Sequence, residues 1–245
     1  MKLEKENASV IAEIDDFDDE NYEAPIPKPS STFKGIFDIF ESFIYAIVAV
    51  LVIFTFFARL TVVDGGSMNS TLADGEYIVV ANPLFTYQPE RGDIVVVHGD
   101  FRHYQETAYG VDLNYQKNYS DPIVKRVIAV GGDTIKIDCN TNTVYVGKGD
   151  DLKKVDESYA QYIFGGFANI TIGEYKVNEN GNKVFVPYYN SETKIFQATV
   201  PKGHVFVMGD NRDNSADSRL REIGFIPEEF IVGEAIFRIA PFTVF

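Results

Sequence analysis

"SFIYAIVAVLVIFTFFA" (residues 42–58) is followed shortly by "VDGGSMNSTLADGEYIVV" (63–80), and these two segments determine the architecture of the chain. The first segment is apolar throughout. Roughly 17 residues at about 1.5 Å per residue give about 25 Å, close to the thickness of a hydrocarbon core. The second segment places Ser67 in a glycine-flanked turn and ends in a β-branched run. The chain therefore changes here from an apolar helix to β-structure.

Three interpretations of the apolar segment compete. A buried core helix is disfavoured because the segment shows no polar face. A cleaved secretion signal is disfavoured because the segment begins late, and because Phe56, Phe57 and Arg59 stand where small residues are needed. We therefore predict a permanent transmembrane anchor over residues 35–60; Leu60, Val62 and Val63 can extend its apolar segment 42–58.

The distribution of basic residues predicts how the anchor is oriented. Four lysines precede it, whereas Arg59 is followed by no further basic residue until Arg91. Basic residues stay on the cytoplasmic side, so the N-terminus is expected in the cytoplasm of a cell-membrane protein and the later residues outside. Residues 1–34 are acidic and proline-rich, which predicts a disordered cytoplasmic tail. The four lysines are Lys2, Lys5, Lys28 and Lys34.

The remainder of the chain consists of short β-branched runs separated by Asn-Pro and Gly-Asp turns. It predicts a mainly β fold: one transmembrane helix, then an antiparallel β-barrel-like catalytic core with an inserted β-rich subdomain. The core is assigned to residues 61–139 and 200–245, and the insertion to 140–199, which carries no readable motif. The runs are EYIVVAN (76–82), DIVVVHG (93–99), PIVKRVIAV (122–130), TIKID (134–138), TVYVG (143–147), KVFVPYY (183–189), HVFVMGD (204–210) and GEAIFRIA (233–240).

Composition excludes several function classes. The net charge of −14, without a basic stripe, argues against a nucleic-acid partner. Cys139, the only cysteine, is expected to be a buried structural thiol. The histidines His98, His103 and His204 lack the spacing of a metal motif, so we expect neither a metal ion nor another cofactor.

Ser67 becomes a nucleophile only if a base accepts its proton. A histidine base is disfavoured because the motif G-x-S-x-G fails at Asn69. Lys125 is the better candidate, since it lies in an apolar run beside Arg126, and adjacent strand residues point to opposite faces. Burial lowers the pKa of a lysine; a fall from about 10.4 to near neutrality costs roughly 4 to 5 kcal/mol.

A polar loop, "GDNRDNSADSR" (209–219), follows the apolar run that ends at Met208. An EF-hand calcium loop starting at Asp213 fails, because Ser218 stands where glycine is needed and Gly224 where glutamate is needed. A plain solvated turn does not explain so many ionic groups directly after an apolar strand. The loop is interpreted as a hydrogen-bonded brace beside a buried site.

Together with the anchor, four segments resemble the type I signal peptidases, membrane-anchored serine proteases with a Ser–Lys dyad. They are "GGSMNSTLADGE" (65–76), "RGDIVVV" (91–97), "IVKRVIAVGGDTI" (123–135) and "VFVMGDNRDNSADSR" (205–219). The resemblance implies that Ser67 is the nucleophile and Lys125 the general base. It further implies that Ser215 positions the lysine amine and that Asp217 and Arg219 form a bracing ion pair. Asp210, Asn211 and Arg212 belong to the same supporting loop.

The resemblance also implies how substrate is held. The backbone N–H of Ser67 is expected to bind the oxyanion; Gly65 offers no side-chain hydroxyl, so a backbone donor or water must assist it. Shallow pockets for small residues at −1 and −3 of the preprotein are expected from Val63, Met68, Leu72, Ile123 and Val124. Ser70 and Gly131 replace prolines common in the family.

The sequence thus predicts a membrane-anchored serine endopeptidase that removes signal peptides from secreted preproteins through an acyl-enzyme, with the lipid bilayer as a partner. One alternative is a non-proteolytic, pilus-associated assembly factor of the same family that works through residues 140–199. Another is a self-cleaving Ser–Lys protease of the stress-response repressor type. The anchor and the lack of a DNA-binding segment count against the latter.

Overall fold

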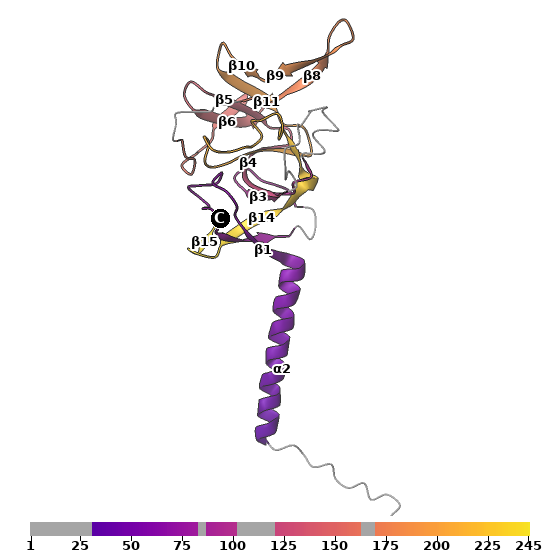
Figure 1. Ribbon diagram of the computed structural model, residues 1–245, viewed down its shortest axis with the longest axis vertical. Coiled ribbons are helices and arrows are strands. Elements are labelled where there is room, and N and C mark those ends of the chain that lie inside the picture. Colours follow the sequence, from indigo (N-terminus) through magenta and orange to yellow (C-terminus); the bar gives the residue numbers. More distant parts are fainter. Residues whose placement is uncertain (1–30, 83–86, 102–120, 163–169) are drawn as a thin grey trace, which may run out of the picture. The chain divides into compact units, whose positions relative to one another are not determined.

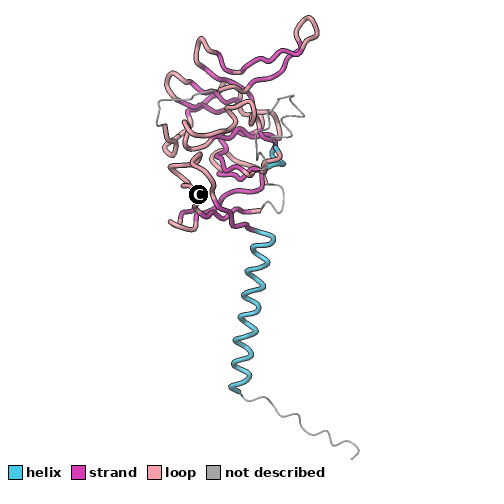
Figure 2. Tube along the Cα trace, in the orientation of Figure 1, coloured by secondary structure: helices cyan, strands magenta, loops and turns pink. Residues whose placement is uncertain are grey.

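The computed structural model describes residues 31–82, 87–101, 121–162 and 170–245 (Figure 1). Residues 1–30 of the expected tail, and His103, lie outside the described residues. The chain divides into two compact units, Met1–Val48 and Ala49–Phe245. Figure 2 shows the change from helix to strands that the opening stretch predicts.

The N-terminal helix α2 (Ser31–Val52) continues as a π-helical turn, η1 (Ile53–Phe57). The span Gly35–Phe57 is 23 residues long, lies exposed, and is apolar enough to cross a membrane by its length and composition. Isoleucine, valine and phenylalanine side chains that no protein surface covers need an apolar environment, and a bilayer supplies one.

The helix ends before the residues that were expected to extend it. Strand β1 (Ala58–Val62) begins immediately after Phe57, so Leu60 and Val62 lie in a strand and not in the anchor. β1 pairs with β2 (Tyr77–Ala81), and the N–H of Asn82 donates to the Phe57 carbonyl at 2.9 Å. This hydrogen bond satisfies a carbonyl at the end of the helix, where no later helical N–H is available.

The prediction of a mainly β, antiparallel fold is confirmed. An eight-stranded sheet runs in the order β1-β2-β14-β3-β4-β12-β13, with β15 on β14, and every strand pair is antiparallel. β4, which carries Lys125, lies between β3 and β12 in the interior of this sheet. The remaining strands of this sheet are β3 (Ile94–Val97), β4 (Ile123–Val130), β12 (His204–Met208), β13 (Ile226–Pro227), β14 (Ile231–Arg238) and β15 (Thr243–Val244), with a short 3-10 helix η2 (Glu228–Phe230) before β14.

A second sheet has five strands in the order β10-β11-β5-β6-β7, and β8 and β9 form a separate hairpin (Figure 1). This sheet begins with β5 at Thr134 rather than at residue 140, so β5 pairs with strands assigned to the insertion and not with the core. The strands are β5 (Thr134–Asp138), β6 (Thr143–Lys148), β7 (Asp151–Lys154), β8 (Gly173–Val177), β9 (Lys183–Pro187), β10 (Tyr189–Asn190) and β11 (Ile195–Thr199).

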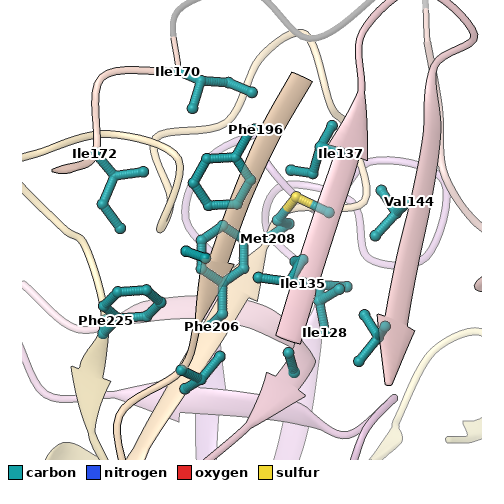
Figure 3. Packing of buried hydrophobic residues seen from close by; sticks show 14 residues of the cluster. Ile128, Ile135, Ile137, Val144, Ile170, Ile172, Phe196, Phe206, Met208 and Phe225 are labelled. Carbon is teal, nitrogen blue, oxygen red and sulfur yellow. The ribbon is translucent and has the colours of Figure 1, made fainter. Parts of the chain in front are cut away.

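The largest core cluster joins the two sheets. Phe206 and Met208 from β12 pack with residues of β5 and β11, and Phe206 lies 5.6 Å from the Phe196 ring and 6.0 Å from the Phe225 ring, between centroids (Figure 3). Cys139 is half-buried against this cluster rather than fully buried, and burial raises the pKa of its thiol. The cluster fixes β12, and therefore the polar loop that follows it, against the second sheet.

Phe206→Ala is expected to lower the free energy of unfolding by about 3–5 kcal/mol, because the ring is fully buried and its removal leaves a cavity. The measurement is urea unfolding of the full chain in detergent micelles. Phe242→Ala is the matched control, since its ring is 70% exposed, and it should cost less than about 1 kcal/mol. Equal losses in both variants would contradict the assignment of this core.

Candidate active site

Ser67 lies in the long connection between β1 and β2, a turn that is closed at its base by backbone hydrogen bonds. The Val63 N–H donates to Glu76 at 2.9 Å, and the Gly75 N–H donates to Val63 at 2.8 Å. Gly65 has a φ of +94°, a conformation that glycine adopts without strain. Met68 and Leu72 are completely buried beneath the turn, so one apolar residue on each side of Asn69 and Ser70 anchors it.

Lys125 projects from the middle of β4 towards this turn. Its side chain is 4% exposed, and Nζ lies 2.7 Å from Oγ of Ser67 and 2.9 Å from the carbonyl oxygen of Val124. The two residues that the sequence proposes as nucleophile and base therefore lie within hydrogen-bond distance, although they are separated by 58 positions in the chain.

Arg126, the residue after Lys125 in β4, is also largely withdrawn from solvent. Its side chain is 12% exposed and forms a bidentate ion pair with Asp210: Nε lies 2.8 Å from Oδ1, and Nη2 lies 2.7 Å from Oδ2. The guanidinium also lies 4.0 Å from the centre of the Tyr159 ring. Both faces of β4 are covered here, so Lys125 and Arg126 each make buried contacts, on opposite sides of the strand.

The polar loop after β12 holds the turn that carries Ser67. The Asn211 N–H donates to the Ser67 carbonyl at 3.0 Å, and the Asn211 carboxamide donates to the Gly66 carbonyl at 3.0 Å. Asp210 accepts a hydrogen bond from the Thr71 hydroxyl. Asn211 and Asp210 of this loop thus hold three residues of the turn, which are Gly66, Ser67 and Thr71.

Asp217 and Arg219 form a buried bidentate ion pair in the same loop. Nε of Arg219 lies 2.7 Å from Oδ1 and Nη2 lies 2.8 Å from Oδ2, while the Gly209 N–H donates to Oδ2 at 3.0 Å. Burial alone would raise the pKa of the Asp217 carboxyl, but the Arg219 guanidinium and these hydrogen bonds outweigh it and hold the pKa below its usual range. The ion pair therefore persists at neutral pH.

Arg212 links the loop to residues 157–162, which the sequence analysis did not place near the site. Its guanidinium pairs with Glu157, lies 2.8 Å from the Tyr162 hydroxyl oxygen, and donates to the Gly209 carbonyl at 3.1 Å. Burial is the largest effect on the Arg212 pKa and lowers it, yet the Glu157 charge leaves that pKa raised overall.

The same segment contacts both the Ser67 turn and the polar loop. The Ser70 hydroxyl donates to the Tyr159 carbonyl at 2.6 Å, and the Gln161 N–H donates to the Asp210 carbonyl at 2.7 Å. Ser70 has a φ of +96°, a value that proline, fixed near −65°, does not reach. The hydroxyl contact holds this turn, and no local sequence signal in "DESYAQY" (156–162) announces it.

Ser215, expected to position the lysine amine, is close to the centre but makes a different contact. Its hydroxyl is buried without a hydrogen-bond partner of good geometry among the described residues, and it lies near enough to Asp217 to lower the pKa of that carboxyl. Gly209 packs against it: a Cβ on Gly209 would lie 2.3 Å from Ser215 Oγ and 2.4 Å from the Ser67 carbonyl oxygen.

The residues predicted to line substrate pockets divide between two core clusters. Val63, Met68 and Leu72 are buried in one cluster, and Val124 packs against it while remaining partly exposed. Ile123 packs against another cluster, which includes Val97 and Val127. Met68 and Leu72 therefore support the turn from below, and Val124 is the member of the group that is open next to Lys125.

No metal centre is visible in the part of the chain that the structure describes: no three His, Cys, Asp or Glu side chains there lie close enough together to hold an ion. His98 is exposed beside Asp100, and His204 lies at the start of β12. Neither contacts Ser67 or Lys125 in the hydrogen bonds found.

Comparison with known proteins assigns the chain to a family. The family model described as signal peptidase, peptidase S26, matches residues 36–240. Signal peptidase IB of Staphylococcus aureus (strain COL) is 32% identical over 216 residues, 86% of this chain and 93% of the relative. Signal peptidase I of Bacillus licheniformis is 29% identical over 217 residues, 88% of this chain and 95% of the relative. The crystal structure of a signal peptidase I from Enterococcus faecalis V583 aligns with a TM-score of 0.35 and 22% identity, covering 61% of this chain and 98% of that chain.

The chain belongs to the signal peptidase family, peptidase S26. It is therefore a hydrolase that cleaves peptide bonds, and its family acts on the signal peptides of preproteins. The resemblance that four segments of the sequence indicated is confirmed.

Gly209→Ala is expected to lower peptidase activity about 100-fold, because the new methyl group displaces the Ser67 carbonyl and with it the Ser67 side chain. The stability cost should be smaller, about 1–3 kcal/mol for overpacking. Preprotein processing and thermal unfolding of the full chain measure the two effects. Gly35→Ala is the control, since nothing lies within 4 Å of its added Cβ. Unchanged activity in Gly209→Ala would contradict this close packing.

Asp217→Asn is expected to destabilise the protein by about 3–5 kcal/mol at pH 7, because Arg219 is left buried without its counter-charge. The folded-state pKa of Asp217 is lowered, so its contribution is present above the unfolded value of about 3.9 and is lost as pH falls through the folded value. The gap between wild type and variant should therefore narrow below about pH 4.

Urea unfolding at several pH values measures that gap, with Asp151→Asn as the control because Asp151 is exposed on β7. A gap that stays constant down to acidic pH would show that the charge of Asp217 does not stabilise the fold.

Proposed function

We propose that this chain removes signal peptides from secreted preproteins, with Ser67 as the nucleophile and Lys125 as the general base. The observation that carries the proposal is the distance of 2.7 Å between Ser67 Oγ and Lys125 Nζ. A serine hydroxyl is a weak nucleophile until a base accepts its proton, and a base must lie within about 2.6–3.2 Å of the atom that it deprotonates. Lys125 meets that condition.

The surroundings of Lys125 suit a neutral amine. Burial disfavours the charged form of an amine, and the side chain is 4% exposed. A neutral amine has one lone pair and two N–H bonds. If one N–H donates to the Val124 carbonyl, 2.9 Å away, rotation of the amine about its last bond is restricted and the lone pair can be directed towards Ser67.

The reaction proceeds in two stages. Lys125 takes the Ser67 proton while Oγ attacks the scissile carbonyl carbon; the tetrahedral intermediate collapses, the peptide C–N bond breaks, and the leaving amine receives the proton from Lys125. Lys125 then takes a proton from water, which attacks the acyl-enzyme ester. Breaking the ester C–O bond releases the signal peptide carboxylate, and Ser67 recovers its proton.

The supporting residues are proposed to act by holding this geometry. Asn211 binds both carbonyls that flank Ser67, and Asp210 fixes Thr71 and Arg126. Asp217, Arg219 and Arg212 order the loop that carries them. Ser215 is proposed to approach the lysine amine once substrate is bound. Rigid positioning of reacting groups within about an ångström is worth orders of magnitude in rate.

Substrate specificity for small residues at −1 and −3 is part of the proposal. The predicted lining consists of Val63, Met68, Leu72, Ile123 and Val124, of which Met68 and Leu72 are fully buried. Because these buried side chains already fill the volume beneath the turn, the space beside Ser67 accommodates short substrate residues better than bulky ones. Val124, the partly exposed member beside Lys125, is the proposed contact.

We also propose that the N-terminus is cytoplasmic and that residues after the anchor face the outside of the cell membrane. The apolar span Gly35–Phe57 and the lysine excess before it support this topology. Bilayer contact extends to the β-domain in this proposal, since Leu60 and Val62 on β1 and Phe242 and Val244 near the C-terminus are exposed apolar side chains. Residues 140–199 are proposed to be a subdomain of the catalytic core rather than an independent module.

The non-proteolytic assembly factor has less support. A relic site would have no need to keep its nucleophile and base in contact, whereas Ser67 and Lys125 lie within hydrogen-bond distance.

Lys125→Ala and Ser67→Ala should each reduce preprotein cleavage by at least about 1000-fold while leaving the fold intact. In the wild type, kcat/KM should rise with pH and level off, since the deprotonated amine is the active form. The measurement is cleavage of a preprotein with alanine at −1 and −3 across pH. Lys153→Ala is the matched control, an exposed lysine on strand β7. Turnover near the wild-type rate in Lys125→Ala would refute the dyad.

A further inference from the structure

The peptide group between Gly66 and Ser67 has a fixed orientation. The Gly66 carbonyl accepts hydrogen bonds from the Asn69 N–H at 3.2 Å and from the Asn211 carboxamide at 3.0 Å. In a trans peptide the N–H points away from the carbonyl, and it lies on the same side of the C–N bond as the preceding Cα. The Ser67 N–H therefore points along the edge that Gly66 Cα occupies, and it has no acceptor within the described ranges.

A second donor lies beside Gly66. Nδ2 of Asn69 is 2.8 Å from the point where a Cβ on Gly66 would sit, and Cγ is 3.4 Å from it. The hydrogen bond from the Asn69 N–H to Gly66 turns the chain back on itself and brings this carboxamide over the preceding glycine. The carboxamide makes no hydrogen bond with the rest of the described chain, and Asn69 is only half-buried. It is an open donor next to the nucleophile.

The two glycines before Ser67 have different physical roles. Gly65 has a φ of +94°, a conformation that glycine adopts with less strain than other residues. Gly66 has no such positive φ, so its backbone would tolerate another residue, but a side chain there would displace the Asn69 carboxamide. Because neither of the two residues before Ser67 has a side chain, there is room beside Gly66 for the carboxamide of Asn69, which follows Ser67 in the sequence.

We propose that Asn69 is a catalytic residue of the cleavage reaction, whose carboxamide N–H donates the second hydrogen bond to the oxyanion beside the Ser67 N–H. As Oγ attacks, the carbonyl oxygen of the substrate gains negative charge, and both donors stabilise it. They do so again when water attacks the acyl-enzyme. Neither donor gives up its proton. The inference rests on the proposed function, and it supplies the donor that Gly65 lacks.

Two other roles for this neighbourhood are weaker. Asn69 does not hold the turn through its side chain, since the turn closes through the Asn69 backbone N–H. Asn214 also presents a carboxamide, but its Nδ2 lies 3.6 Å from the same point on Gly66 and the residue is exposed. Asn69 is nearer and is fixed by the turn itself.

The test uses the full chain in detergent micelles and a peptide with alanine at −1 and −3. Asn69→Ala should lower kcat by about 100-fold, as expected for loss of one oxyanion donor. KM should stay within about threefold, and the midpoint of the pH–rate profile should not move, because Lys125 is untouched. Asn69→Asp has the same shape without the donor, and its negative charge should lower kcat further.

A double-mutant cycle separates the amide from the turn. Gly66→Ala should also lower kcat, because its methyl group displaces the Asn69 carboxamide. In the Asn69→Ala background the same change should cost less than about threefold, since there is no carboxamide left to displace. Fully additive losses would overturn the proposal.

Inhibition by a peptide aldehyde with alanine at the same positions is a second measurement, and a purely structural role of Asn69 would not change it. The aldehyde forms a tetrahedral adduct with Ser67, and its inhibition constant should rise in Asn69→Ala by the factor that kcat falls. Asn214→Ala serves as the matched carboxamide control and should alter kcat less than about threefold.

A kcat in Asn69→Ala within threefold of wild type, with the variant folded by thermal unfolding, overturns the proposal. So does a loss accompanied by a moved pH midpoint, which would assign Asn69 to positioning the dyad. If the folded wild-type chain does not cleave the peptide at all, the proposed function fails instead.

Discussion

The contact between Lys125 and Ser67 joins an interior strand to a loop that has no regular structure of its own, and the rest of the site exists to maintain it. β4 is held on both sides by β3 and β12, so the position of the lysine is set by sheet register. The serine has no such support from strands. Its position is set by the buried Met68 and Leu72 beneath it and by hydrogen bonds from Asn211. The amine of Lys125 is thus positioned by the sheet, and the hydroxyl of Ser67 is positioned by the loops that hold its turn.

This arrangement requires charged side chains to be buried, and the loss of their hydration is energetically unfavourable. Arg126, Arg212 and Arg219 are withdrawn from water, and each is paired with a carboxylate. A buried ion pair contributes little net stability relative to apolar packing, because desolvation offsets its attraction. Its value here is geometric: bidentate pairs fix the loop after β12 in one conformation, and that loop holds the peptide groups around Ser67.

Residues 157–162, which belong to the predicted insertion, and the second sheet both contact parts of the site. Glu157 forms an ion pair with Arg212 of the supporting loop, and the Tyr159 carbonyl accepts a hydrogen bond from the hydroxyl of Ser70 in the Ser67 turn. The second sheet also shares the cluster of Phe196, Phe206 and Ile137 with β12. Residues 157–162 and the second sheet therefore contact the supporting loop, the turn and the strand that precedes the loop. This agrees with a subdomain that has become part of the site.

The apolar span, most of the strands and the polar loop can be predicted from the sequence, because each follows from neighbouring residues: the length of an apolar run, alternation with period two, or a local motif. Local motifs also single out Ser67 and Lys125, which the fold brings within 2.7 Å of each other. The burial of Arg126, the place of β5 in the second sheet, and the contacts of residues 157–162 with the Ser67 turn and the polar loop follow from the tertiary structure. Such contacts join residues up to 89 positions apart. They depend on sheet register and on how two sheets pack, which no stretch of neighbouring residues encodes.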